Sequence, residues 1–215
     1  MKNKQIIMLA SGVTVLTVCL LLCFHLFPAA NEHNPTTSYI YPTQISSQEQ
    51  TYRSKIVSMA ESFLGYKESN GTHREIIDIY NAHIPLAVNY KVQYTDEWCA
   101  TFGSAVAIKC NLTKIIPTEC GCERQIQLFQ DIGCWIEDDA YIPLPGDYIF
   151  YHTGHSGNGD CADWSDHVGI VVYSSGDTIK VIEGNYLGSV RYRTVPVDDV
   201  MIRGFGVPDY SSVTE

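Results

Sequence analysis

The chain has 215 residues, of which 14 are basic and 24 acidic, so its formal net charge is −10. Hydrophobic residues are 45% of the chain and charged residues 18%, a composition that can bury a core and excludes a wholly disordered protein. The acidic excess repels a phosphate backbone, so we expect no general binding of nucleic acid.

Residues 1–30 have the pattern of a membrane anchor or signal segment. Lys2 and Lys4 precede Ile6–Phe27, which is 22 residues without a formal charge. A secretory signal has an apolar run of about 7–15 residues, whereas a membrane-spanning helix needs about 20. The length favours a single-pass anchor, and the lysines favour a cytoplasmic N-terminus with the rest of the chain outside the cell membrane. Small residues after the apolar run leave cleavage and secretion as the alternative.

The remaining chain divides into a linker, a domain and a tail. Residues 31–50 are polar and rich in Ser, Thr and Pro, which is typical of a linker. Residues 51–210 form the predicted domain, and residues 211–215 a short tail. Apolar residues at helical spacing predict four helices in the first half of the domain: Tyr52–Leu64, a helix that opens at Thr72 and runs through Tyr80, Trp98–Lys109, and Gln125–Ile132.

Two of these helices carry start signals. Thr72–Glu75 has the form of a capping box, in which a threonine and a glutamate satisfy each other's backbone N–H groups. Thr95 or Asp96 is suited to cap the helix that begins at Trp98. The segment 81–94 has no clean period, and we expect a loop there.

In the second half of the domain the spacing of apolar residues changes from that of helices to that of strands. Val, Ile and aromatic residues cluster in about five short runs, with the polar loop Gly154–Asp166 between the first two. Helices followed by strands predict an α+β fold, with the helices packed on a mostly antiparallel sheet. The predicted strands are Tyr148–Tyr151, His167–Tyr173, Thr178–Glu183, Val190–Val195 and Met201–Phe205.

Cys99 is the candidate nucleophile. It lies in the first turn of a predicted helix, where free N–H groups and partial positive charge stabilise a thiolate and lower its pKa. The same N–H groups are suited to bind an oxyanion. A cysteine at a helix start is more often a small buried residue, so the assignment depends on a base being close.

A base and an orienting group are predicted on a β-hairpin. His167 begins one strand, and Glu183 ends the next in the run Glu183–Asn185. A turn near Gly176 would pair the two strands and bring His167 close to Glu183. Cysteine, histidine and a polar third member together suit nucleophilic catalysis. The spacing leaves open whether Glu183 or Asn185 orients the histidine.

Five motifs together resemble the cysteine-, histidine-dependent amidohydrolase/peptidase (CHAP) family. The resemblance covers about Tyr52–Tyr210, and the segment Gly65–Glu68 is similar to the lead-in of bacterial members. Each motif alone is unspecific, whereas their order and context are specific. The motifs are Trp98–Phe102, Pro145–Asp147, Asp166–Val171, Glu183–Asn185 and Gly204–Tyr210.

The resemblance implies a papain-like α+β fold and hydrolysis of amide bonds in peptidoglycan, as an endopeptidase or an N-acetylmuramoyl-L-alanine amidase. It assigns Cys99 as nucleophile, His167 as base and Glu183 as the orienting residue, with Asn185 at a further polar position of the active site. Two other functions stay open: a thiol acyltransferase on wall peptides, and a non-catalytic wall-binding component of a secretion or conjugation apparatus.

The other cysteines do not form a recognisable framework. Six cysteines lie beyond the apolar segment, and the single residue between Cys120 and Cys122 is a poor spacing for a mutual disulfide. A structural role between helices is the simplest reading of these two. Four of these cysteines are a candidate zinc-ligand set, although their spacing is not the usual pair of CxxC motifs. They are Cys120, Cys122, Cys134 and Cys161.

The sequence gives equally weak evidence for the other candidate metal ligands. Asp96 and Glu97, before the nucleophile, lack the alternating acids of a calcium loop. His152 and His155 are placed to bind a metal with Cys161, but we expect surface residues. We also expect a solvated loop rather than a metal site from Asp160, Asp163 and Asp166. We therefore predict no metal and no cofactor.

Overall fold

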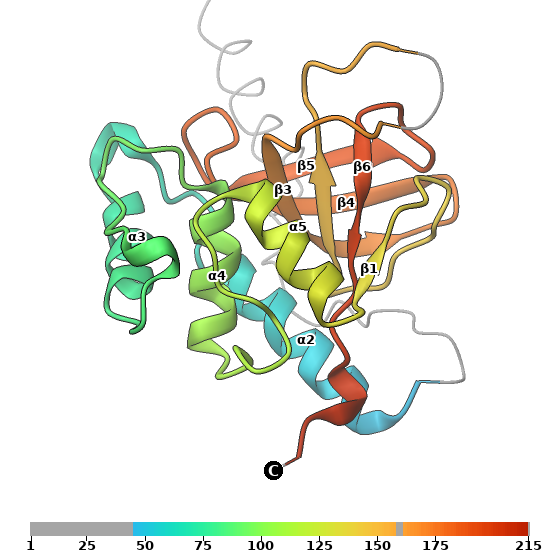
Figure 1. Cartoon of the computed structure of the whole chain (residues 1–215), viewed down its shortest axis with the longest axis horizontal. Coiled ribbons are helices and arrows are strands. Elements are labelled where there is room, and N and C mark those ends of the chain that lie inside the picture. Colours follow the sequence, from blue (N-terminus) through green and yellow to red (C-terminus); the bar gives the residue numbers. More distant parts are fainter. Residues whose placement is uncertain (1–44, 158–160, 215) are drawn as a thin grey trace, which may run out of the picture. The chain divides into compact units, whose positions relative to one another are not determined.

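The computed structural model describes residues 45–157 and 161–214. It confirms the α+β class: four helices, mostly before the strands in the chain, and a six-stranded sheet in which every pair is antiparallel (Figure 1). The strand order is β1-β6-β2-β3-β4-β5. The strands are β1 (Trp135–Ile136), β2 (Tyr148–Tyr151), β3 (His167–Ser174), β4 (Thr178–Glu183), β5 (Arg191–Pro196) and β6 (Ile202–Gly206).

The helices occupy the predicted order with shifted ends. They are α2 (Ser47–Ser62), α3 (His73–Asn81), α4 (Cys99–Lys109) and α5 (Cys122–Asp131). Single 3₁₀ turns occur at η2 (Glu68–Asn70), η3 (Ala87–Asn89) and η4 (Tyr210–Ser212). Strand β1 was not predicted, because a strand of two residues is too short to show an alternation of apolar and polar residues.

The start of α2 corrects the predicted linker. Ser46 is the N-cap, and its side chain accepts a hydrogen bond from the Glu49 backbone N–H at 3.1 Å. The helix therefore begins at Ser47, inside the stretch 31–50 that was predicted to be entirely a linker. A polar first turn conceals a helix from a search based on apolar spacing, because only later turns face the core.

Both predicted N-terminal caps are wrong. The Thr72 hydroxyl accepts a hydrogen bond from the Lys67 N–H at 2.8 Å and caps no N–H of α3, so no capping box forms. Asp96 accepts from the Gln93 N–H at 2.7 Å and closes a turn ahead of α4. Because α4 begins at Cys99 with Trp98 as its N-cap, Asp96 lies too far upstream to cap the helix.

The core lies on both faces of the sheet. Helix α4 is buried from Cys99 to Ala107, and it contacts both α3 and β3, between which it lies (Figure 1). Burial on nearly all sides explains its largely apolar sequence. The opposite face of the sheet has a smaller cluster that includes Ile149, Val181 and Phe205.

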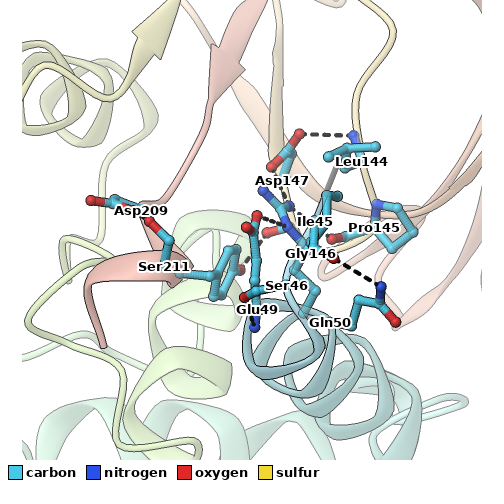
Figure 2. A network of polar contacts seen from close by, with 12 residues as sticks. Ile45, Ser46, Glu49, Gln50, Leu144, Pro145, Gly146, Asp147, Asp209 and Ser211 are labelled. Atoms are coloured by element: carbon cyan, nitrogen blue, oxygen red, sulfur yellow. Dashed lines mark hydrogen bonds and ion pairs between the residues drawn. The ribbon is translucent and has the colours of Figure 1, made fainter. Parts of the chain in front are cut away.

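A buried ion pair joins α2 to the turn before β2. The Arg53 guanidinium donates to Asp147 at 2.8 Å and to the Pro145 carbonyl at 3.0 Å. Figure 2 shows the Asp147 carboxylate receiving the Leu144 N–H, with Glu49 nearby on the first turn of α2. Burial disfavours the charged form of Arg53, but its interactions with Asp147 and Glu49 together outweigh burial and raise its pKa.

The C-terminal motif completes this network. The Tyr210 ring lies under the Arg53 guanidinium, and its hydroxyl donates to the Gly146 carbonyl at 2.7 Å. Gly146 has φ +90°, and a Cβ there would lie 3.0 Å from the Tyr210 hydroxyl, so glycine suits the turn. The motifs Pro145–Asp147 and Gly204–Tyr210 therefore have a structural role, which is to join the two ends of the domain.

The described residues contain no helix with both the length and the apolar character needed to cross a membrane. The predicted anchor Ile6–Phe27 lies outside the described residues.

Candidate active site

Cys99 is the first residue of α4. Its side chain is buried, at 6% exposure, and it follows the fully buried Trp98. The Trp98 indole N–H donates to the Glu68 carboxylate at 3.0 Å and so ties the start of α4 to the segment Gly65–Glu68. The thiol therefore has a rigid position at a helix N-terminus, where the helix dipole favours negative charge.

A second thiol lies against the first. Cys122 is the first residue of α5, and its Sγ atom is 3.5 Å from the Sγ atom of Cys99. Two helix N-termini thus converge on one pair of sulfur atoms. All six cysteines between Cys99 and Cys161 are free. Sequence reasoning missed this neighbour, because it predicted a start for α5 at Gln125 and so placed Cys122 outside the helix.

The surroundings favour the thiolate form of Cys99. A hydrogen bond from Cys122 is the largest influence and lowers the pKa of Cys99; burial opposes it, and the His167 imidazole lowers the pKa further. The same interaction raises the pKa of Cys122, which stays protonated as the donor. The pair is therefore asymmetric, with Cys99 as the thiolate and Cys122 as its hydrogen-bond donor.

His167 and Glu183 meet across the β3–β4 hairpin. The register pairs Gly169 with Glu183, and the His167 Nε2 atom is 3.5 Å from the Glu183 Oε2 atom. The turn between the strands contains Gly176 with φ +94°, as the hairpin prediction required. With Nε2 directed at Glu183, Nδ1 is the ring nitrogen that remains for the thiol.

The two neighbours keep His167 protonated. Burial alone would lower the pKa of His167, but its interactions with Cys99 and Glu183 raise the pKa to about 10. The imidazole ring also stacks on Tyr151 at a centroid distance of 6.0 Å. A thiolate beside an imidazolium is the form in which a cysteine nucleophile is already activated.

Glu183 is fully buried and has two cationic neighbours. Besides His167, the Arg193 guanidinium on β5 lies 3.7 Å from its Oε1 atom. Cationic neighbours of this kind offset the cost of burying a carboxylate. Sequence analysis did not identify Arg193, since its position beside Glu183 depends on the β4–β5 pairing of Val181 with Arg193.

Glycines in the two motifs make room for these contacts. A Cβ on Gly169 would lie 2.7 Å from the Glu183 Cγ atom, so glycine lets the carboxylate side chain pass across β3. A Cβ on Gly184 would collide with the side chain of Phe102 on α4. The run Glu183–Asn185 therefore packs directly on the helix that carries Cys99.

Asn185 is not the orienting residue in this geometry. Its amide donates a short hydrogen bond to Glu97, two residues before Cys99. Its backbone has φ +58°, a left-handed conformation that asparagine tolerates well. Asn185 thus links the end of β4 to the segment before α4, and Glu183 alone of the two candidates faces His167.

The candidate sets of metal ligands, none of which was predicted to bind a metal, are only partly brought together. The four-cysteine zinc set does not form, because Cys122 lies against Cys99 while Cys134 follows the end of α5. Asp166 accepts hydrogen bonds from the N–H and hydroxyl of Thr153, and Asp160 lies outside the described residues. His152, His155 and Cys161, expected at the surface, do converge, with Cys161 buried.

These features define an α+β protein with a thiol, an imidazole and a carboxylate arranged in sequence around the start of one helix. Comparison with protein-family models, with curated proteins and with solved structures gives no match for the chain. Functional inference therefore depends on the geometry of the site and on the motifs that form it.

Proposed function

We propose that the chain is a cysteine-dependent amidohydrolase or peptidase that cleaves amide bonds of peptidoglycan, as its resemblance to the CHAP family implies. The single observation that carries this proposal is the Cys99–His167–Glu183 arrangement, in which the pKa of the thiol is lowered and that of the imidazole raised. Perturbed pKa values of this kind cluster at functional sites.

The chemistry follows from the atoms present. The Cys99 thiolate attacks a carbonyl carbon and forms an S–C bond, and N–H groups in the first turn of α4 stabilise the oxyanion. The His167 imidazolium donates a proton to the amine as the C–N bond breaks. The neutral imidazole then takes a proton from water, which attacks the thioester, releases the carboxylic acid and restores the thiolate.

Each remaining residue has a positioning role in this scheme. Glu183 holds the His167 ring and stabilises its charge, as the acidic member of such a triad does. Cys122 donates to the thiolate, and Arg193 forms an ion pair with Glu183.

The cellular setting is part of the proposal. The apolar segment Ile6–Phe27 would anchor the chain in the cell membrane with the domain outside, next to the wall. By analogy, such an enzyme would open the wall locally for a secretion or conjugation apparatus. Secretion after cleavage of the segment remains the alternative.

The test is digestion of purified peptidoglycan by the full-length chain in detergent under reducing conditions, with fragments identified by mass spectrometry. We expect new amino and carboxyl ends that depend on Cys99, with Cys99→Ala as the inactive control and Cys134→Ala as the matched active one. Their positions distinguish an endopeptidase from an amidase. Transfer to an added amine instead of water would favour the acyltransferase, and no fragments from several wall types would favour a binding role.

A further inference from the structure

The loop between β2 and β3 brings four side chains with metal-binding atoms together. They are His152, His155, Cys161 and Asp163, and one potential ligand atom from each lies within 4.8 Å of the others. None of the four belongs to the Cys99–His167–Glu183 arrangement. Within residues 45–157 and 161–214, this is the single group of three or more such side chains.

The donor set matches one class of cation. Two imidazoles and a thiolate suit zinc and similar borderline ions, whereas calcium and magnesium take oxygen ligands. Thiolate and carboxylate together carry two negative charges, which balance a divalent cation. Zinc ligand atoms lie about 2.0–2.3 Å from the ion, and so about 3.3–3.8 Å from one another in a tetrahedron. Side-chain movements of about 1 Å would bring the four atoms to that spacing.

Polar atoms in this cluster lack partners. The Nε2 atom of His155 is buried without a hydrogen-bond partner, and the buried Nδ1 atom of His152 has only the Asp163 carboxylate near it, beyond hydrogen-bond distance. Asp163 Oδ2 lies 3.1 Å from His155 Nδ1 and 3.6 Å from His152 Nδ1, so one carboxylate serves two rings. Leaving buried nitrogen atoms unpaired costs free energy, which coordination of a cation would remove.

The backbone holds half of the donors in place. His152 directly follows β2, and its N–H donates to the Met201 carbonyl at 2.9 Å. The His155 N–H donates to the His152 carbonyl at 3.0 Å, so the two imidazoles share one turn. Thr153, between them, binds the Asp166 carboxylate at 2.8 and 2.9 Å and joins this turn to the residue before His167.

We propose that His152, His155, Cys161 and Asp163 bind one zinc-like divalent cation in a closed, four-coordinate structural site. Four protein ligands leave no open position for a reacting water, so the ion would stabilise the loop rather than catalyse. It would fasten the strand that ends at Tyr151 to the segment that leads into His167. This inference is independent of the proposed hydrolase activity.

The test measures metal directly. The full-length chain is purified in detergent with a reductant, stripped with a chelator and reconstituted with Zn²⁺ or, as a spectroscopic probe, Co²⁺. We expect one metal ion per chain by elemental analysis, and with Co²⁺ the visible bands of a tetrahedral site plus a sulfur-to-cobalt charge-transfer band. Cys161→Ser should abolish that band, and His155→Gln should weaken Zn²⁺ binding about 100-fold or more, since even outer-shell partners contribute about 10- to 100-fold.

Matched controls separate this site from other donors. His83→Gln changes a half-buried histidine beyond α3, and Cys134→Ser a half-buried thiol beyond α5; both should keep one metal ion. Asp163→Asn changes the most exposed of the four side chains, so it is the ligand variant that should disturb folding least. Circular dichroism checks that each variant is folded. The proposal is wrong if the parent chain binds no stoichiometric metal, or if binding survives Cys161→Ser but is lost in Cys99→Ala, which would place the ion on the Cys99–Cys122 pair.

Discussion

The Sγ atoms of Cys99 and Cys122, the first residues of two different helices, lie 3.5 Å apart. One sulfur of such a pair becomes the thiolate and the other its donor, because two negative charges cannot share the space. The His167 imidazole further lowers the pKa of Cys99, whereas the Asp166 carboxylate further raises the pKa of Cys122, so the thiolate forms on Cys99. The thiolate of the pair is thus selected by tertiary contacts and not by its helix position, which both cysteines share.

Replacing Cys122 should make Cys99 less acidic. Cys122→Ala removes the donor, and a hydrogen bond to a charged group contributes about 1.5–3 kcal/mol, so we expect the pKa of Cys99 to rise by about one unit or more. Cys122→Ser, which keeps an O–H donor, should shift it less. The measurement is the pH midpoint of Cys99 alkylation by iodoacetamide, followed by mass spectrometry of its peptide. An unchanged midpoint in Cys122→Ala would contradict the assigned hydrogen bond.

Replacing Glu183 should lower the pKa of His167. Glu183 is one of the two groups that raise that pKa to about 10, and the imidazolium is lost as pH rises through it. In Glu183→Gln we expect the alkaline limb of the pH–rate profile to move to lower pH and hydrolysis to fall by about 10²-fold or more. Histidine NMR titration measures the shift without a substrate. A titration identical to that of the parent chain would remove Glu183 from the site.

Asn185 should matter less than Glu183. Its amide binds Glu97, so its loss disturbs the approach to α4 and leaves the His167 partners in place. Glycine is the neutral replacement, because Asn185 has φ +58°. We expect Asn185→Gly to reduce hydrolysis by less than about tenfold, well below the about 10²-fold assigned to general acid–base groups. If Asn185→Gly moves the His167 titration as far as Glu183→Gln does, the two roles have been assigned the wrong way round.

Breaking the Arg53–Asp147 pair should destabilise the domain. Both side chains are buried, so Asp147→Asn removes one of the two carboxylates that Arg53 contacts, leaves Glu49 as the other, and costs about 3–5 kcal/mol. A domain of this size should then lose about 6–20 °C in melting temperature. Arg124→Gln is the control: its partner Glu119 keeps N–H donors from Cys120 and Gly121, and Arg124 is 48% exposed, so about 1 kcal/mol or less is expected. Equal melting temperatures for the two variants would contradict the structural role of the Pro145–Asp147 motif.

Local sequence patterns predicted those helices and strands whose formation depends on apolar spacing and turn residues. The α+β order, the helix that starts at Cys99 and the hairpin through Gly176 all follow from apolar periods and turn residues. Hairpin pairing also brought His167 to Glu183, because strands joined by a short turn have little choice of register. Helix starts were predicted less well, since α2 and α5 begin with polar turns that have no apolar period.

The sequence by itself therefore determined the class of fold, the nucleophile candidate and its base. Only the tertiary structure decided which residues surround them: Cys122 beside Cys99, Arg193 beside Glu183, and Asn185 bound to Glu97. It also gathered two histidines, a cysteine and an aspartate of one polar loop within 4.8 Å of one another. The physical reason is that helix packing, strand order and loop closure join residues far apart in the chain, and these contacts leave no periodic signal in the sequence.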